Sequence, residues 1–339
     1  MRPALWICVA LVLTPALALG AKAHRPREHK EPAPRFAPFQ PAAPKGCDET
    51  CLDGYVDQVL RAMMEHDPSR APLAADVRYT ENGEAKAPGQ GLWASASAIA
   101  IEDDGLSSLG RSSSAYRLYF ADPASGQAAY LGAFTEEGRP GMLMLRIKAA
   151  AGKVGEIETV IVRQESPSPG PNGPPAFDPK AFTEPEPGLL AGGERWPPNI
   201  MTAAANRYFD GLVRRSSAGV PLGPDCVRRD NGVAAAGACA AQLDSGVFGS
   251  IAQVRRRILV VDEDRGLVMA VALVDHGPPV TGAEPKTKKK KPKGAPQPAP
   301  APLSTELMGA VFKMSEGKIT RIEALERPAP PGLASTWGG

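Results

Sequence analysis

The sequence has few of the side chains that most often bind metals or carry out catalysis. Its 339 residues include four histidines and five cysteines, and these lack the close Cys and His spacing of a zinc site. Basic and acidic side chains nearly cancel, with 39 Lys and Arg against 37 Asp and Glu. A chain with so little net charge has no general attraction for nucleic acid. We therefore expect no nucleic-acid partner, no metal and no cofactor.

Long apolar runs are also scarce, and the one at the start of the chain has the form of an export signal. Arg2 precedes an apolar run from Ala4 to Ala18, and small residues follow the run. The run is short for a helix that spans a membrane. The sequence predicts a signal peptide over residues 1–23, a periplasmic or secreted protein, and no stable membrane insertion.

Four cysteines remain beyond this signal, and an even number in an exported protein suggests disulfides. Cys226 and Cys239 enclose a short loop and are the first pair expected. Cys47 and Cys51 lie four residues apart at a predicted helix start, where a bridge requires a non-helical first turn. Two free thiols are the alternative for this second pair.

Proline is abundant, and its distribution divides the chain, because proline is excluded from helix interiors and central strands. Most of the 36 prolines fall in three stretches. These are a leader over residues 24–46, a linker over residues 166–198, and an insertion over residues 277–303 that contains a lysine run from Lys286 to Lys293. The sequence predicts ordered modules at residues 47–165 and 199–330, with a tail at 331–339.

The two predicted modules repeat a series of short patterns in the same order. Asp76 to Gly83 matches Asp225 to Gly232, and Gly152-Lys153-Val154 matches Gly317-Lys318-Ile319. Further matches pair Tyr55-Val56-Asp57 with Tyr208-Phe209-Asp210, and Ala71-Pro72-Leu73 with Val220-Pro221-Leu222. Repeated local patterns imply repeated supersecondary structure. We therefore expect two copies of one unit.

Each module begins with a helical pattern and ends with strand-like runs. Apolar residues from Leu52 to Met63 recur at helical spacing, and Pro68 ends the pattern. Strands are predicted at 127–135, 142–149 and 156–162 in the first module, and at 267–274, 307–314 and 319–326 in the second. This order predicts an α+β fold in which a curved antiparallel sheet wraps around helices.

The last strand of the first module carries apolar side chains on both faces. Ile157 and Ile161 share one face, whereas Glu158, Val160 and Val162 share the other. A sheet with two apolar faces needs two covers. We expect the two modules to pack sheet to sheet as an internal pseudo-dimer, with a homodimer through the same faces as the alternative.

The motifs resemble the SnoaL-like family of the nuclear transport factor two-like superfamily, in a tandem form found in exported proteins. The resemblance spans both modules and rests on a Tyr-containing first helix, the Arg-x-x-Glu-Asn-Gly and Arg-Arg-Asp-Asn-Gly segments, and a last hairpin ending Gly-Lys-Ile-x-x-Ile-Glu. It implies two cone-shaped modules whose interiors can hold a ligand. The lysine-rich insertion departs from the family pattern. Because superfamily members include isomerases, dehydratases, polyketide cyclases and binding proteins, the fold alone does not decide the activity.

His276 is the histidine best placed to act in such a cone, and Asp275 precedes it. A carboxylate that orients an imidazole base is a common catalytic arrangement, so His276 and Asp275 are candidate catalytic residues. On a continuous strand, however, neighbouring side chains point to opposite faces. A solvated His and Asp at a strand end is the alternative.

Five further side chains are candidate ligand contacts. Tyr208 and Tyr55 lie on the first helices, where a hydroxyl could reach the ligand or pack in the core. Arg228 and Asp230 could bind a ligand or pair with each other. Arg146 lies among apolar neighbours and needs a partner, for which Glu158 is available.

The leading functional hypothesis is an exported protein that binds a small, partly apolar molecule in one cone, with the other module mainly structural. One alternative is a cofactor-independent lyase or isomerase that uses His276 or Asp275 as base, while Tyr208 or Arg228 steadies an enolate-like charge. The other is a cell-envelope interaction protein that uses the lysine-rich loop.

Overall fold

A computed structural model describes residues 47–101, 116–163, 177, 190, 193–278 and 304–337, without the side chains of residues 256–258. The predicted signal peptide and leader, most of the linker and nearly all of the lysine-rich insertion lie outside the described residues, so the predictions for them stay predictions. Within the described ranges, no helix has both the length and the apolar character needed to cross a bilayer.

The first group of elements, module 1, consists of short helices and one sheet. In chain order they are α1 (Glu49–Met64), η1 (Pro68–Arg70), β1 (Leu73–Glu81), β2 (Glu84–Lys86), α2 (Leu92–Ser95), β3 (Ala96–Ile99), β4 (Arg117–Asp122), β5 (Gln127–Glu136), β6 (Arg139–Ala150) and β7 (Lys153–Arg163). The strands lie in the order β2-β1-β7-β6-β5-β3, and β4 also pairs with β5.

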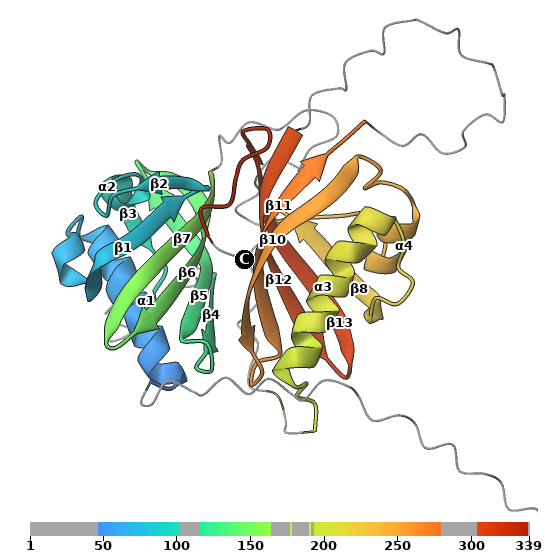
Figure 1. Cartoon of the computed structure of the whole chain (residues 1–339), viewed down its shortest axis with the longest axis horizontal. Helices are drawn as coiled ribbons and strands as arrows, with labels where there is room; N and C mark the ends of the chain where they lie inside the picture. Colours follow the sequence, from blue (N-terminus) through green and yellow to red (C-terminus); the bar gives the residue numbers. More distant parts are fainter. Residues whose placement is uncertain are drawn as a thin grey trace, which may run out of the picture. The chain divides into compact units, whose positions relative to one another are not determined.

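The second group, module 2, repeats this arrangement (Figure 1). Its elements are α3 (Pro198–Arg214), β8 (Leu222–Asp230), β9 (Val233–Ala234), α4 (Cys239–Asp244), β10 (Ile251–Asp262), β11 (Leu267–His276), β12 (Ser304–Ser315) and β13 (Lys318–Ala329). The strand order β9-β8-β13-β12-β11-β10 corresponds to β2-β1-β7-β6-β5 with β4. The α+β fold with two sheet modules expected from the sequence is confirmed.

Both sheets are mixed rather than purely antiparallel, which corrects one detail of the prediction. β1 pairs with β7 in parallel, and β8 pairs with β13 in the same way. Parallel neighbours need a long connection between them, whereas antiparallel neighbours can be joined by a tight turn. The whole meander separates β1 from β7 along the chain, so the connection is long enough for the parallel pairing.

In each module, one Asn-Gly turn ends the first strand and is hydrogen-bonded to the last strand. Asn82 and Asn231 have φ angles of 55° and 51°, in the left-handed region that Asn and Gly tolerate best. The Asn82 side chain accepts the backbone N–H of Ile161 at 2.8 Å, and the Asn231 side chain accepts that of Glu326 at 2.9 Å. Asn82 and Asn231 are therefore equivalent positions of the two modules.

The buried faces of α1 and α3 correct the expected pairing of Tyr55 with Tyr208. We align α1 with α3 by the interval that separates Asn82 from Asn231. Every buried residue of α1 then corresponds to a buried residue of α3. The pairs are Leu52 with Met201, Val56 with Ala205, Val59 with Tyr208, Leu60 with Phe209, Ala62 with Gly211, and Met63 with Leu212. The counterpart of Tyr208 is therefore Val59, and that of Tyr55 is Ala204. A shift of about one helical turn preserves the buried face, so the apolar pattern alone did not fix the register.

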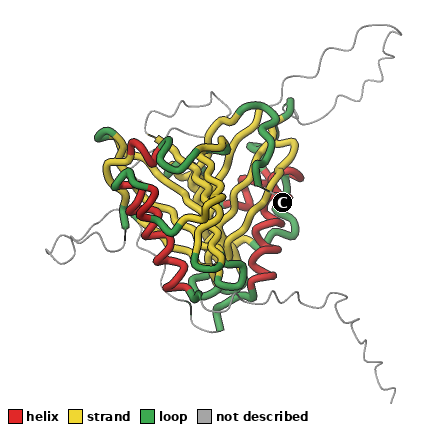
Figure 2. The backbone as a smooth tube through the Cα atoms, turned by 60° about the vertical axis from the view of Figure 1, so that its left-hand side comes forward, coloured by secondary structure: helices red, strands yellow, loops and turns green. Residues whose placement is uncertain are grey.

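Each helix covers one face of its own sheet, and the other faces of the two sheets share a third core. Ile157 and Ile161 pack in the core under α1. Val160, Val162 and Met144 instead pack with module 2 side chains, among them Met269, Val271 and Leu325. Figure 2 shows the strands between the helices of the two modules. The sheet-to-sheet packing predicted from the two apolar faces of β7 is thus present within one chain.

Polar contacts cross this shared core. The hydroxyl of Tyr116 donates to Glu323 at 2.5 Å, and the backbone N–H of Ala121 donates to Asp262 at 3.2 Å. The segment after β13 also reaches module 1, where the ring of Trp337 lies 4.5 Å from the Arg78 guanidinium and 5.0 Å from that of Arg146. Part of the predicted tail is therefore a packed segment that joins the modules.

Both cysteine pairs are bridged. Cys226 and Cys239 form the pair expected first, and Cys47 bonds to Cys51. Helix α1 begins at Glu49 after the N-cap Asp48, so Cys47 lies outside the helix. The spacing of the two cysteines required at least one of them to lie outside regular helical geometry, and Cys47 does.

The N-terminus of α1 contacts the turn between β10 and β11, and we expect the strength of this contact to depend on pH. Burial, a hydrogen bond with Asp264 and the charge of Asp262 raise the pKa of Glu49 to about 7, although Arg265 opposes the shift from 3.6 Å. The ordinary pKa is 4.5, so between these values the folded chain binds more protons than the unfolded chain. The free energy of unfolding should therefore fall as the pH rises through this window.

Chemical unfolding of the wild type and of Glu49→Gln across this window measures the effect. Because Gln does not titrate, the unfolding free energy of the wild type minus that of the variant should be highest below about pH 4.5 and should fall as the pH rises through 7. A difference that stays constant with pH would contradict the contact.

Candidate functional site

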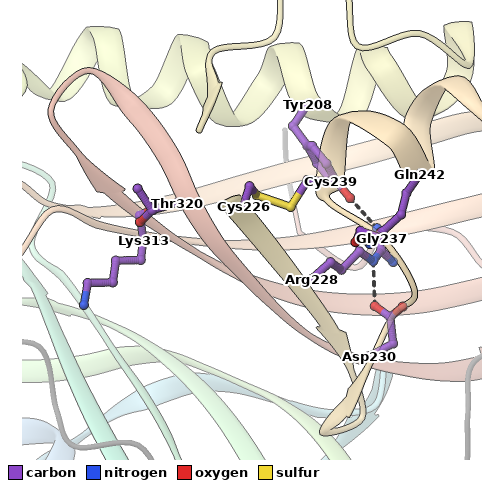
Figure 3. The surroundings of a disulfide bond; sticks show 9 residues. All are labelled: Tyr208, Cys226, Arg228, Asp230, Gly237, Cys239, Gln242, Lys313 and Thr320. Carbon is purple, nitrogen blue, oxygen red and sulfur yellow. Dashed lines mark hydrogen bonds and ion pairs between the residues drawn. A yellow bond between two sulfur atoms is a disulfide. The ribbon is translucent and has the colours of Figure 1, made fainter. Parts of the chain in front are cut away.

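The interior of module 2 contains a buried guanidinium with three polar partners. Arg228 lies in this interior, and only 2% of the residue is exposed. Its Nε donates to Asp230 at 2.7 Å, its Nη1 to the hydroxyl oxygen of Tyr208 at 2.5 Å, and its Nη2 to Glu326 at 2.6 Å. Figure 3 shows Tyr208 and Asp230 on two sides of the guanidinium. We call these four residues the Arg228 cluster.

Strand alternation brings the cluster together under α3. Arg228 and Asp230 are two residues apart on β8, so they point to the same face. Glu326 follows Ile322 and Ala324 on the same face of β13, and these two residues pack in the core beneath α3. Tyr208 enters from α3 itself. Three elements therefore converge on one guanidinium.

The Cys226–Cys239 disulfide places a cover over this group. Cys226 lies two residues before Arg228 on the same face of β8, and Cys239 is the first residue of α4. The bond holds α4 beside the cluster, as Figure 3 shows. Closing a loop of this length stabilises the fold by about 3 kcal/mol in a chain-entropy model. The ring of Phe248, in the segment after α4, lies 4.8 Å from the Arg228 guanidinium.

The surroundings set the charge of the cluster. Burial opposes the charge of Arg228, but Asp230, Tyr208 and Glu326 outweigh it and raise the pKa of the guanidinium. Burial, reinforced by the charge of Asp230, also raises the pKa of Glu326 well above its usual range despite the opposing charge of Arg228. These shifts favour a charged Arg228, which pairs with Asp230, and a protonated Glu326 beside them.

His276 and Asp275 point to opposite faces, as alternation along the strand predicts. Asp275 accepts two hydrogen bonds from Arg255 at 2.5 and 2.9 Å and one from Thr305 at 2.7 Å. The hydrogen bonds from Arg255 lower the pKa of Asp275, and that from Thr305 adds to the effect. Asp275 is therefore held as a carboxylate on the face away from α3, where it cannot orient His276.

His276 has a different carboxylate beside it. Its Nδ1 lies 2.9 Å from the hydroxyl of Ser250, and its Nε2 lies 3.1 Å from Glu306 in an ion-pair contact that lacks hydrogen-bond geometry. Glu306 is close enough to Glu326 for its charge to contribute to the raised pKa of that residue. His276 and the Arg228 cluster thus belong to one polar region on the helix-facing side of the sheet.

Arg146 and Tyr55 lie elsewhere. Arg146 is on the sheet face that meets module 2, where it donates to Glu158 at 3.2 Å, Glu156 at 2.9 Å and Gln127 at 2.8 Å. Tyr55 is half-buried on α1 and packs at the edge of the module 1 core. The structure therefore joins three of the five predicted contacts, Tyr208, Arg228 and Asp230, and separates the other two from them.

At the matching described positions, module 1 keeps one acidic member of the cluster, because Glu81 stands where module 2 has Asp230. Tyr79 and Ile161 occupy the positions of Arg228 and Glu326, and Val59 occupies that of Tyr208. The Trp93 ring lies 5.9 Å from the Tyr79 ring in an edge-to-face contact. An ion pair between Arg163 and Glu81 lies 3.5 Å apart in module 1, but Arg163 is 32% exposed.

Sequence reasoning missed Glu326, Glu306 and Ser250. One signal was available for Glu326, because it continues the inward-facing series Ile322 and Ala324 with a charged residue. A charge in a series of buried apolar positions requires a partner. Glu306 and Ser250 gave no comparable signal, since each lies at a strand end where polar side chains are common.

Comparisons with known proteins cover one module at a time. Residues 194–326 match a protein-family model described as "Domain of unknown function (DUF8021)". No curated protein matches the chain.

Similar solved structures include a SnoaL-like polyketide cyclase from Agrobacterium tumefaciens str. C58, with 16% identity and a TM-score of 0.24, covering 37% of this chain and 90% of that chain. An LEH-like epoxide hydrolase from M. tuberculosis has 14% identity and a TM-score of 0.27, with 38% and 83% covered. BvnE pinacolase from Penicillium brevicompactum has 12% identity and a TM-score of 0.27, with 38% and 83% covered.

Substitution of Arg228 tests whether the cluster is needed for stability. Arg228→Met alone should lower the free energy of unfolding by about 3–5 kcal/mol, because it leaves two buried carboxyl groups without their cation. The triple variant Arg228→Met, Asp230→Leu, Glu326→Leu should recover most of this loss, since apolar replacement of a whole buried ionic group is often neutral or stabilising. Chemical denaturation measures both variants.

Arg139→Met is the matched control, because the ion pair of Arg139 with Glu137 is exposed at the surface. It should cost less than about 1 kcal/mol. If the triple variant were as unstable as Arg228→Met, the cluster would be a requirement of the fold.

Proposed function

We propose that module 2 binds a small, partly apolar molecule beside the Arg228 cluster and that module 1 is mainly structural. The observation that carries this proposal is that module 2 has the buried Arg228 with Asp230 and Glu326 as partners, whereas Tyr79 and Ile161 fill the positions of Arg228 and Glu326 in module 1. Two modules with one topology thus differ at their centres.

The energetics of buried ion pairs support a functional reason for this difference. Removing two charges from water costs several kcal/mol for each ion, and well-packed apolar side chains are often as stabilising. Module 1 is an example of the same strand arrangement with an aromatic and an aliphatic residue in those places. The fold therefore does not require Arg228 and Glu326, and their presence is better explained by a ligand that they contact.

The neighbours of the cluster suit a ligand with both apolar and polar parts. The Tyr208 ring lies 5.4 Å from that of Phe312 in an edge-to-face contact, and Phe248 covers the guanidinium. Asp230 is the most exposed member of the cluster, with 14% of its side chain accessible. Val247, beside Phe248, is 67% exposed. We place the entry of the ligand at this turn segment between α4 and β10.

We also propose that the protein works outside the cytoplasm. The predicted signal peptide motivates this proposal, and the bonds Cys47–Cys51 and Cys226–Cys239 support it, because disulfides persist in oxidising compartments. The second of these bonds holds the cover of the proposed site, so loss of oxidation would loosen the site itself.

Native mass spectrometry of the purified full chain tests the binding proposal. The wild type should carry a small molecule that the triple variant Arg228→Met, Asp230→Leu, Glu326→Leu has lost. The module 1 variant Glu81→Gln should carry the same molecule at the wild-type level. Retention by the triple variant, or loss from Glu81→Gln alone, would count against a site in module 2.

A second candidate function is a cofactor-independent lyase or isomerase, which the contacts of His276 favour. Glu306 takes the place expected for Asp275 as the carboxylate beside the imidazole. His276 would remove a proton from a carbon next to a carbonyl group, and the hydroxyl of Tyr208 or the Arg228 guanidinium would steady the charge that develops on the carbonyl oxygen.

His276→Gln separates this function from simple binding. If the protein is an enzyme, the substitution should lower the turnover of the copurified molecule by at least about 100-fold, since a positioned base contributes about 10²–10⁴ to the rate. If it is a binding protein, the affinity should stay within severalfold. Conversion by His276→Gln at the wild-type rate would exclude His276 as the base.

A further inference from the structure

We infer that the module 2 site accepts an uncharged molecule with a carbonyl or hydroxyl oxygen and rejects carboxylates and phosphates of the same shape. This inference rests on the proposed function, because it concerns the ligand of the same site. A buried arginine usually suggests an anionic ligand, since a guanidinium matches carboxylate and phosphate in geometry. The contacts of Arg228 indicate the opposite preference.

Three of the five guanidinium N–H donors already have acceptors within the protein. Nε donates to Asp230, and one N–H of each terminal nitrogen donates to Tyr208 or Glu326. Each of the three nitrogens therefore already makes one hydrogen bond, and the guanidinium carbon lies 4.8 Å from the centre of the Phe248 ring. An anion would have to share this cation with the Asp230 carboxylate and would find only the N–H groups that the three partners leave.

The charges around the guanidinium also disfavour an anion. Asp230 balances Arg228, so a ligand meets a group with no net positive charge. Glu306 lies beyond Glu326 on the same side of the sheet, next to His276. A ligand carboxylate would be brought out of water toward Asp230 and Glu306, while the cation of the cluster already pairs with Asp230, which is strongly unfavourable in a buried site.

A neutral oxygen, in contrast, finds a donor. Arg228 donates to the oxygen of Tyr208, so the Tyr208 hydrogen is directed to another acceptor. The raised pKa of Glu326 favours a proton on that carboxyl group as well. A ketone, ester, amide or alcohol oxygen that accepts from either group adds a hydrogen bond without adding a charge.

Matched pairs of probes on the full chain test the inference. Each pair consists of a methyl ketone and the carboxylate on the same scaffold, such as 2-acetylnaphthalene with 2-naphthoate and acetophenone with benzoate. At neutral pH, calorimetry should give the ketone at least a tenfold lower Kd in every pair that binds. A carboxylate that binds as tightly as its ketone, or more tightly, would overturn the inference and leave the binding proposal standing.

Asp230→Asn supplies the charge control, because it removes the balancing carboxylate and keeps the shape of the side chain. The preference for ketone over carboxylate should shrink at least tenfold or reverse in this variant, whereas Glu81→Gln in module 1 should leave it unchanged. An unchanged preference in Asp230→Asn would overturn the charge argument. If no probe of either kind binds the wild type, the proposed function itself fails.

Discussion

The buried guanidinium of Arg228 is the interaction on which the account of this protein depends. A cation without access to water must be neutralised by its neighbours, and its donors must find acceptors. Asp230 supplies the charge, and Tyr208 and Glu326 supply two further acceptors. Burial and the charge of Asp230 raise the pKa of Glu326, which favours a proton on this second carboxyl group. The Cys226–Cys239 bond joins α4 to the part of β8 that carries Arg228 and so fixes the position of α4.

A second constraint explains why two modules occur as one packed body. The last strands, β7 and β13, have apolar side chains on both faces, and a helix covers only one of them. The remaining faces cover each other, and their polar residues, Glu158 and Glu323, find partners in Arg146 and Tyr116. Module 1 thus provides a surface that module 2 needs, which is a structural role that does not require a ligand of its own.

Much of this arrangement could be predicted from local sequence rules. The alternation of Ile157 with Glu158 and Val160 fixed which side chains face the other module, and the same rule separated Asp275 from His276. The Asn-Gly pairs gave the turns that end β1 and β8. These features depend on neighbouring residues, where the geometry of a strand or turn leaves few choices.

Other features depend on contacts between distant segments, and these could not be predicted in the same way. Residues about one turn apart lie on the same face of a helix, so the apolar pattern fits more than one alignment of α1 with α3. The buried faces of both helices were needed to show that Tyr208 corresponds to Val59. Glu306, beside His276, comes from β12, and Glu326, beside Arg228, comes from β13, so the register of β11 with β12 and that of β8 with β13 decide these two contacts. Arg146 was expected near a ligand because it needed a partner, but partners on the module interface satisfied the same need.

The protonation of Glu326 connects the structure of the cluster to the kind of molecule that it can accept. Infrared difference spectroscopy between the wild type and Glu326→Gln at neutral pH measures it most directly. The account predicts a carbonyl stretching band of a protonated carboxylic acid that is present in the wild type and absent from the variant. A difference spectrum that contains only carboxylate bands would show a charged Glu326 and would contradict the account of a cluster without net charge.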